Sequence, residues 1–256
     1  FISYQQIKFG KPSIPKIMEY YNLSKKNEFI ENQNFEDTID FQNEINLENI
    51  SFGYRKDKYI IKNLNLKICK NKILGISGES GSGKSTIVNL LTGLIKTSEG
   101  NIKIDGKKIS SPIQLRKYQN LFSVSSQDSY MIDGTIKDNI TFGSSEKISF
   151  EKLNFAIKFA SLESTIKELN DGVDTYIGSS IKQLSSGQKQ RISIARSIYN
   201  DREILIFDEA TNALDQENEQ LIIKNLANLK LKKTIIIISH NPDNLKICDN
   251  IFKLDN

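Results

Sequence analysis

Alternating apolar and polar side chains in three stretches predict β-strands. INLENISFGY (45–54) and IIKNLNLKI (60–68) alternate as strands with one buried face do. NIKIDGKKI (101–109) alternates around Asp105 and Gly106, a pair that favours a tight hairpin turn. Together the three stretches predict an antiparallel β layer at the beginning of a domain.

Continuous apolar runs predict a second kind of strand. KILGIS (72–77) is short and buried in character, and EILIFDEA (203–210) and KTIIIIS (233–239) are typical of parallel strands covered on both faces. Apolar residues recur at helical spacing in STIVNLLTGLI (85–95), and helical patterns dominate between about 145 and 200. This order predicts an α/β fold with a mostly parallel sheet and an inserted helical subdomain.

The first 43 residues differ from the rest in composition. They are polar, rich in Asn and Glu, and interrupted by two prolines, while IPKIMEYYNL (14–23) predicts a short amphipathic helix. We interpret residues 1–43 as a connector from an earlier domain, and residues 44–256 as one domain with a helical subdomain over about 128–199. The chain begins at Phe1 rather than Met, so we expect a segment upstream.

Composition narrows the classes of protein. A net charge of +4 that comes from scattered lysines does not favour nucleic-acid binding, which usually requires a clustered basic face. Cys69 and Cys248 fit neither a metal-ligand spacing nor a disulfide framework, which favours a reducing compartment. No apolar run approaches the roughly 18–20 residues that span a bilayer.

The stretch GISGESGSGKST (75–86) predicts a phosphate-binding loop. It matches G-x-x-x-x-G-K-[ST] and stands between a predicted strand and a predicted helix. Glycines let backbone N–H groups turn toward phosphate oxygens, and the helix start adds a positive dipole end. Lys84 would reach the β- and γ-phosphates, and the Ser85 hydroxyl would coordinate Mg²⁺. The predicted nucleotide-binding residues are Gly78, Glu79, Ser80, Gly81, Ser82, Gly83, Lys84, Ser85 and Thr86.

Two carboxylates end the predicted strand in ILIFDEA. Asp208 would hold Mg²⁺ through water, and Glu209 would act as the general base on the attacking water. An acidic helix start would explain these two residues alone, but it does not explain their combination with a phosphate loop. A nucleoside triphosphate site with hydrolytic chemistry is therefore predicted.

LSSGQKQRISIARSIY (184–199) resembles the L-S-G-G-Q signature of the ATP-binding cassette (ABC) ATPases, and it precedes the acidic strand as in that family. The resemblance covers roughly residues 44–256. It implies that Ser185, Ser186, Gly187 and Gln188 form a cradle for the γ-phosphate of ATP bound by a second copy, in a head-to-tail homodimer.

The resemblance also assigns a role to each of four single residues. By resemblance, Tyr54 would stack on adenine, and Gln127 would sense Mg²⁺ and the attacking water. Asp215 would lie in the loop that communicates across the dimer. His240 is the only histidine of the chain. A lone histidine is more often a packed residue than a catalytic one, but the resemblance assigns His240 to the γ-phosphate and the catalytic water.

The sequence departs from the family pattern at three positions. Ser186 replaces a glycine of the signature, which adds a small side chain that we expect the site to tolerate. Ser179 stands where exporters carry Glu, and Ile181 where they carry Gly, in the loop that touches the membrane domain. Coupling to a membrane domain is therefore where the carry-over is weakest.

SSQDSYMIDGTIKDNITFG (125–143) resembles the exporter branch of the family. It implies a C-terminal nucleotide-binding domain of a half-transporter, on the cytoplasmic face of a plasma membrane, with the transmembrane domain upstream in the same polypeptide. The Lys, Asn and Ile content suggests a bacterium. The stretch 7–23 also resembles flippases for lipid-linked sugars, although peptide or lipid export fits equally.

Two alternatives come from other classes. An ABC ATPase acting on DNA or ribosomes predicts a coiled-coil insertion after Gln127 or a second cassette, and the sequence contains neither. A catalytically silent dimerisation module predicts loss of Glu209 or His240, and both residues are present.

Overall fold

A computed structural model describes the chain over seven ranges. These are residues 14–18, 21, 39–55, 58–79, 81–144, 146–178 and 184–254. Residues 14–18 are helical, which confirms the beginning of the predicted helix, but all of their side chains are exposed, so the structure does not test its amphipathic character. The rest of 14–23, apart from residue 21, lies outside the described residues. No helix among the described residues is long and apolar enough to cross a bilayer.

The predicted antiparallel β layer is confirmed. Its strands, in the spatial order β2-β1-β4-β5, are Ile61–Cys69, Glu44–Phe52, Glu99–Ile104 and Lys107–Lys108. Asp105 and Gly106 form the turn between β4 and β5 with φ angles of 46° and 80°. Both angles are positive, as a two-residue hairpin turn with the right-handed twist of its strands requires.

The predicted parallel sheet is also confirmed. Its order is β11-β3-β10-β9-β6, formed by Asn250–Leu254, Ile73–Gly78, Thr234–Ile238, Ile204–Asp208 and Phe122–Ser125. Isoleucines 235 and 237 face one hydrophobic core and isoleucines 236 and 238 the other, and all four are buried. A strand covered on both faces explains why this run contains no alternating polar residue.

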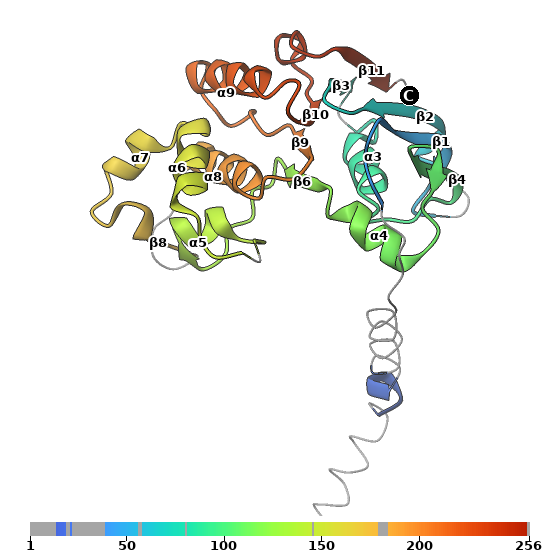
Figure 1. Cartoon of the computed structure of the whole chain (residues 1–256), viewed down its shortest axis with the longest axis horizontal. Coiled ribbons are helices and arrows are strands. Elements are labelled where there is room, and N and C mark those ends of the chain that lie inside the picture. The colour runs from blue at the N-terminus through green and yellow to red at the C-terminus, as the bar shows by residue number, and fades with distance from the viewer. Residues whose placement is uncertain are drawn as a thin grey trace, which may run out of the picture.

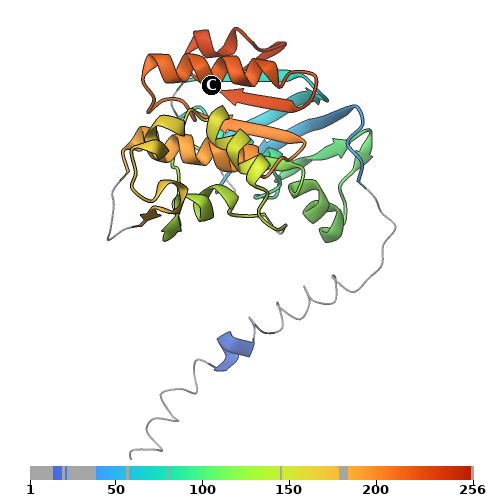
Figure 2. The ribbon, with the colours of Figure 1, turned by 60° about the vertical axis from the view of Figure 1, so that its left-hand side comes forward.

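Helices cover both faces of the parallel sheet (Figures 1 and 2). One core contains side chains of α3 and α4 together with the antiparallel sheet, and the other contains side chains of α5, α6, α8 and α9. The helices are α3 (Lys84–Leu91), α4 (Pro112–Gln119), α5 (Ile136–Thr141), α6 (Phe150–Phe159), α7 (Glu163–Lys167), α8 (Ser186–Tyr199) and α9 (Gln216–Asn228). The small ladder of β7 (Gly134–Thr135) and β8 (Tyr176–Ile177) joins the helical side.

Some boundaries differ from the sequence prediction. The helix predicted over 85–95 ends at Leu91, because Gly93 adopts a φ of 68°. The stretch 149–169 divides into α6 and α7 at Ser161, whose φ is 54°. Sequence reasoning did not predict α4, α9, β6 or β11. The α/β fold class with an antiparallel layer and inserted helices is nevertheless confirmed.

Candidate active site

Three groups of candidate residues meet at the carboxyl edge of the parallel sheet. Strands β3, β10 and β9 are neighbours and end at Gly78, Ile238 and Asp208. The phosphate loop, His240 and Glu209 follow these strand ends directly along the chain. Ligands of open α/β sheets bind at this edge.

The phosphate loop turns through glycines at positive φ. Gly81 and Gly83 have φ angles of 82° and 100°, and α3 begins directly after Gly83 without a side-chain cap and without an acidic residue in its first turn. A Cβ on Gly83 would lie 3.0 Å from Ile61 Cδ1, so the loop packs closely on the start of β2. The uncapped, carboxylate-free start of α3 suits an anion. Ser80 lies outside the described residues.

Lys84 lies across the loop. Its side chain is 7% exposed, and Nζ donates hydrogen bonds to the carbonyls of Gly78 and Glu79 at 2.9 and 2.8 Å. The same ammonium lies 3.7 Å from Glu209 Oε1. Buried charges need such partners, and phosphate oxygens could replace them.

Asp208 and Ser85 form an oxygen pair beside the loop. Ser85 Oγ donates to Asp208 Oδ2 at 3.2 Å, and Asp208 is 9% exposed. Burial raises the pKa of Asp208, and the Glu209 charge raises it further, while the Ser85 hydrogen bond and Lys84 lower it. One carboxylate and one hydroxyl are a donor set that suits Mg²⁺, which keeps water and phosphate oxygens as its other ligands.

Glu209 occupies a strained backbone position. Its φ is 50°, in the left-handed region that costs a non-glycine residue energy. The conformation turns its carboxylate toward Asn212, whose Nδ2 donates to Oε2 at 2.8 Å, and toward His240, whose Nδ1 lies 3.9 Å from Oε1. His240 is 63% exposed, so it faces the open side of the site rather than the core.

A buried polar network supports the His240 loop from behind. Asn244 Nδ2 donates to Glu219 Oε1 at 2.7 Å, to Thr211 Oγ1 at 3.2 Å and to Ser239 Oγ at 3.4 Å. Thr211 Oγ1 donates to the same Glu219 oxygen at 2.9 Å. The network joins the segment after Glu209, the segment before and after His240, and α9.

The signature residues lie at the start of α8 rather than at the phosphate loop. Ser185 caps α8, because its hydroxyl accepts from Gln188 N at 3.2 Å while the Gln188 side chain accepts from Ser185 N at 3.0 Å. A Cβ on Gly187 would lie 2.9 Å from the Ala213 carbonyl, so α8 begins against the loop after Glu209. In the described part of the chain, no hydrogen bond or ion pair joins Ser185, Ser186, Gly187 or Gln188 to the phosphate loop.

The remaining candidates are Tyr54, Gln127 and Asp215. Tyr54 is 65% exposed with its ring edge-to-face on Phe52, and Gln127 is exposed two residues beyond the end of β6. Asp215 caps α9 by accepting from Asn218 N at 2.9 Å, and the Asn218 hydrogen bonds lower the pKa of Asp215. Within the described ranges, no hydrogen bond or ion pair places Gln127 or Asp215 on Asp208 or Lys84. Ser179 and Ile181 lie outside the described residues.

Sequence reasoning missed three supporting side chains. Gln190, buried in α8, donates to the Glu209 carbonyl at 3.2 Å and accepts from Ala213 N at 2.9 Å. Asn212 and Asn244 contact Glu209 and the His240 loop as described above. Asn212 stands three residues after Glu209, and this short spacing could have predicted a contact between the two side chains. The contacts of Gln190 and Asn244 depend on the tertiary structure and could not be predicted from sequence spacing.

A glycine-rich loop between a buried strand and a helix, with an acidic strand end beside it, defines the class of P-loop nucleoside triphosphatases. The chain belongs to the ABC transporter family, whose family model matches residues 61–212. Membership implies ATP binding, and the resemblance inferred from the signature is confirmed.

Named relatives point to the exporter branch. The chain is 39% identical over 220 residues to the alpha-hemolysin translocation ATP-binding protein HlyB of Escherichia coli O157:H7, covering 85% of the chain and 31% of that protein. It is 35% identical over 213 residues to the ATP-dependent lipid A-core flippase of Vibrio vulnificus strain YJ016, covering 83% of the chain and 36% of that protein. The chain thus spans about a third of the length of these relatives.

A solved structure of a bacterial Atm1-family ABC exporter with ATP bound is similar to the fold. The TM-score is 0.83 at 30% sequence identity, and the match covers 99% of this chain and 44% of that one. The exporter-type resemblance is therefore confirmed by sequence and by structure.

Proposed function

We propose that the chain is the ATP-hydrolysing domain of an ABC exporter. The observation that carries the proposal is the Glu209 carboxylate, which lies next to both the Lys84 ammonium and the His240 ring at the mouth of the phosphate loop. A base, a cation and an orienting group at one place are what attack of water on a γ-phosphate requires.

In this proposal Lys84 exchanges its carbonyl partners for β- and γ-phosphate oxygens, and the start of α3 holds the remaining phosphate charge. Glu209 accepts a proton from water as the water oxygen bonds to the γ-phosphorus. The bond from that phosphorus to the bridging oxygen breaks, which gives ADP and inorganic phosphate. His240 orients the water. Mg²⁺, which Ser85, Asp208 and Gln127 would hold, supplies neutralisation of phosphate charge when bound.

The signature cradle would serve the nucleotide of a second copy. Among the described residues, no hydrogen bond or ion pair joins the start of α8 to its own phosphate loop, and Ser185 and Ser186 are exposed. A head-to-tail homodimer would therefore enclose two ATP molecules. We further propose an upstream transmembrane domain in the same polypeptide, at the cytoplasmic face of a bacterial plasma membrane, to which the cycle is coupled.

Phosphate release from Mg-ATP tests the hydrolytic role. We expect Glu209→Gln to lower turnover by about 100-fold or more while ATP still binds, because the substitution removes the base and keeps the shape. Glu217→Gln is the matched control, since Glu217 is an exposed carboxylate on α9, and it should leave turnover within about twofold. Equal turnover in the wild type and Glu209→Gln would refute the assignment.

A further inference from the structure

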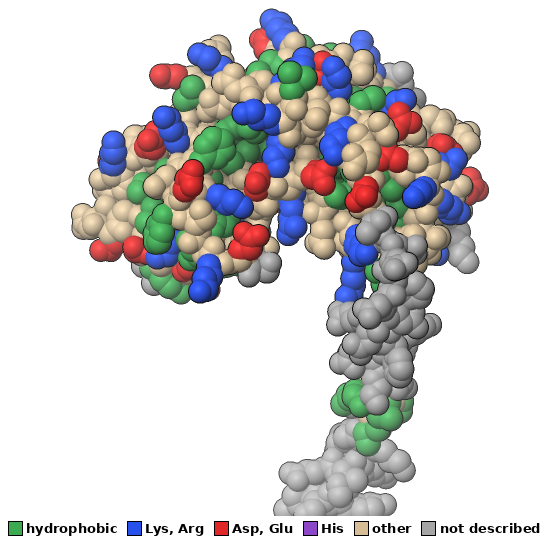
Figure 3. All heavy atoms as spheres, in the orientation of Figure 1, with side chains coloured by type: hydrophobic (Ala, Val, Ile, Leu, Met, Phe, Trp, Pro, Cys, Tyr) green, Lys and Arg blue, Asp and Glu red, His purple; other side chains and the backbone are tan. Residues whose placement is uncertain are grey.

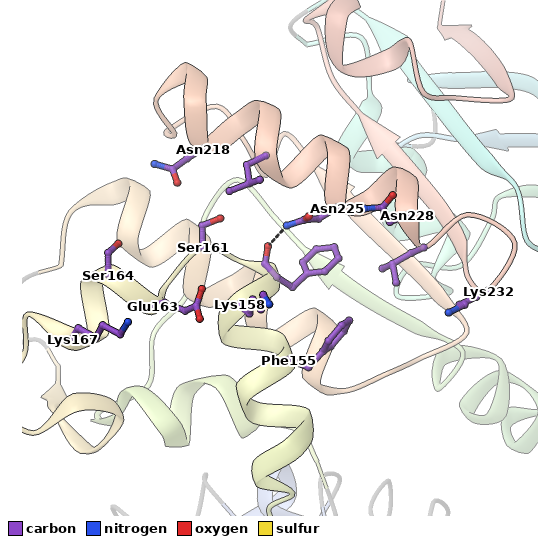
Figure 4. A pocket seen from close by; sticks show the side chains of 13 residues that line it. Phe155, Lys158, Ser161, Glu163, Ser164, Lys167, Asn218, Asn225, Asn228 and Lys232 are labelled. Atoms are coloured by element: carbon purple, nitrogen blue, oxygen red, sulfur yellow. Dashed lines mark hydrogen bonds between the residues drawn. The ribbon is translucent and has the colours of Figure 1, made fainter.

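A groove lies between the helical insertion and α9 (Figure 4), and its lining includes no residue of the phosphate loop and neither Glu209 nor His240. Its volume is about 790 Å³, and it is lined by α6, the turn after α6, α7 and α9. Nothing in the proposed hydrolytic mechanism uses these residues. Small-molecule sites in proteins have volumes of roughly 300–1,000 Å³.

The groove has an apolar wall. Phe155 is 54% exposed and Leu221 is 44% exposed, although both are large apolar side chains. The Phe155 ring lies 6.1 Å from the ring of Phe159, which also lines the groove together with Leu229. The space-filling view shows hydrophobic side chains on this face among charged side chains of both signs (Figure 3). Apolar surface of this kind gains free energy when a ligand covers it.

The charged lining is mostly positive. Lys158, Lys167 and Lys232 line the groove, against the single carboxylate of Glu163. In the close-up, Lys158 and Lys232 lie on either side of Phe155 (Figure 4). Lysine ammonium groups next to an aromatic wall favour a ligand that carries both an apolar body and a negative charge.

The groove is preformed by hydrogen bonds across its floor. Asn225 Nδ2 on α9 donates to the Phe159 carbonyl at 3.0 Å, which joins α9 to α6. Arg191 of α8 donates to the Ser161 carbonyl at 2.6 Å and to Thr165 Oγ1 at 3.1 Å, which fixes the turn between α6 and α7. A site with fixed walls loses less entropy when it binds a ligand.

The walls also reach the segments proposed to act across the dimer. Arg191 belongs to α8, the helix that begins with the signature residues. Asn218 lines the groove, and its side chain donates to Asp215 Oδ2 at 2.7 Å at the start of α9. A ligand in the groove would therefore touch residues whose other partners are Asp215 and the signature helix.

We propose that this groove binds an anionic amphiphile, a molecule with an acyl or aryl body and a carboxylate, sulfonate or phosphate group. The apolar body lies along Phe155 and Leu221, and the anion lies near Lys158 or Lys232. Occupancy alters ATP turnover through Asn218 and Arg191. This regulatory part rests on the proposed function; binding itself does not.

The test uses two matched probes on the 256-residue chain. 8-Anilinonaphthalene-1-sulfonate is the anionic probe, and N-phenyl-1-naphthylamine is its neutral analogue without the sulfonate. Each is titrated by fluorescence with and without ATP. The variants are Phe155→Ser and Lys158→Glu in the groove. The control is Phe150→Ser on the same helix, because Phe150 is 67% exposed and does not line the groove.

We expect saturable binding of the sulfonate at one probe per chain, unaffected by ATP. Phe155→Ser should weaken binding of the sulfonate about tenfold, because it removes apolar surface that the probe covers. Lys158→Glu should weaken binding by about the same factor, because it replaces an ammonium near the sulfonate by a carboxylate. The neutral probe should bind the wild type about tenfold more weakly than the sulfonate does. Phe150→Ser should change the affinity less than about twofold. Turnover of the wild type should shift as the probe saturates the groove, and Phe155→Ser should need about tenfold more probe for the same shift.

Displacement by ATP, or equal weakening by Phe150→Ser, would overturn the binding proposal. Saturable binding that leaves the turnover of a hydrolysing wild type unchanged would overturn the regulatory part. A chain that binds the probe as expected but hydrolyses no ATP would support the groove and refute the proposed function, so the two failures are distinguishable.

Discussion

At the scale of single residues, two acidic residues of the site occupy positions that cost folding free energy. Asp208 carries a carboxylate in a buried position, and Glu209 adopts a left-handed backbone. Both features cost folding free energy, and both place oxygen atoms where metal and water would be needed. Stability and function therefore compete at these two positions.

Asp208→Asn should make the ligand-free chain more stable and less active. Burial raises the pKa of Asp208 in the folded chain, so unfolding releases a proton and the native carboxylate lowers stability as pH rises above its unfolded pKa. The variant should melt about 3 °C above the wild type near pH 7, with the difference shrinking toward pH 4. Turnover should fall about 100-fold.

Differential scanning calorimetry across that pH range measures the first effect. A lower melting temperature for Asp208→Asn at neutral pH would show that the Ser85 hydrogen bond and Lys84 outweigh the burial cost. Ser85→Ala serves as the comparison, because it removes the hydrogen bond and leaves the carboxylate in place.

At the scale of elements, strands were easier to predict than the contacts between them. The run of four isoleucines marked β10, because a strand buried on both faces needs apolar side chains at every position. The short β6 contains Ser123 and Ser125, and Ser125 is buried with its hydroxyl hydrogen-bonded to Ser193 Oγ at 3.1 Å. That pairing depends on a helix 68 residues further along the chain, so no local pattern could reveal it.

The candidate site shows the same division. The glycine-rich loop, the acidic strand end and the signature could be read from the sequence, because each is a local motif. The φ of 50° at Glu209 and the Asn244 network could not be read, since both arise where separate strands and α9 meet.

The Asn244 network should act through His240. Asn244→Leu removes the donor that joins Ser239, Thr211 and Glu219, so we expect kcat to fall by roughly tenfold or more with little change in KM for ATP. In a His240→Ala background the same substitution should have almost no further effect on kcat.

This double-mutant cycle separates positioning from general destabilisation. A variant that merely unfolds the chain would lower turnover in both backgrounds, and additive effects would contradict the positioning role. Asn200→Leu is the matched control, because the Asn200 side-chain amide also donates more than one hydrogen bond, but to backbone carbonyls at the far end of α8. Its effects in the two backgrounds should be small and additive.

At the scale of the whole molecule, the proposed function divides the residues of one chain into two half-sites. The phosphate loop and Glu209 lie at the sheet edge, while the exposed Ser185 and Ser186 lie at the start of α8. Among the described residues, no hydrogen bond or ion pair joins Ser185 or Ser186 to the phosphate loop or to Glu209. The two halves lie in different parts of the fold in Figure 1, where α3 and α8 are separated by the parallel sheet. On the proposed function, a complete site needs two chains.

The dependence of ATP turnover on protein concentration tests this claim most directly. With saturating Mg-ATP, turnover per chain should rise with concentration and then level off, as chains pair around nucleotide. Glu209→Gln should stay inactive at every concentration, which excludes a contaminating ATPase. Turnover per chain that does not change across a range of about 100-fold, down to concentrations at which the chain is monomeric, would show that one chain suffices and would contradict the composite site.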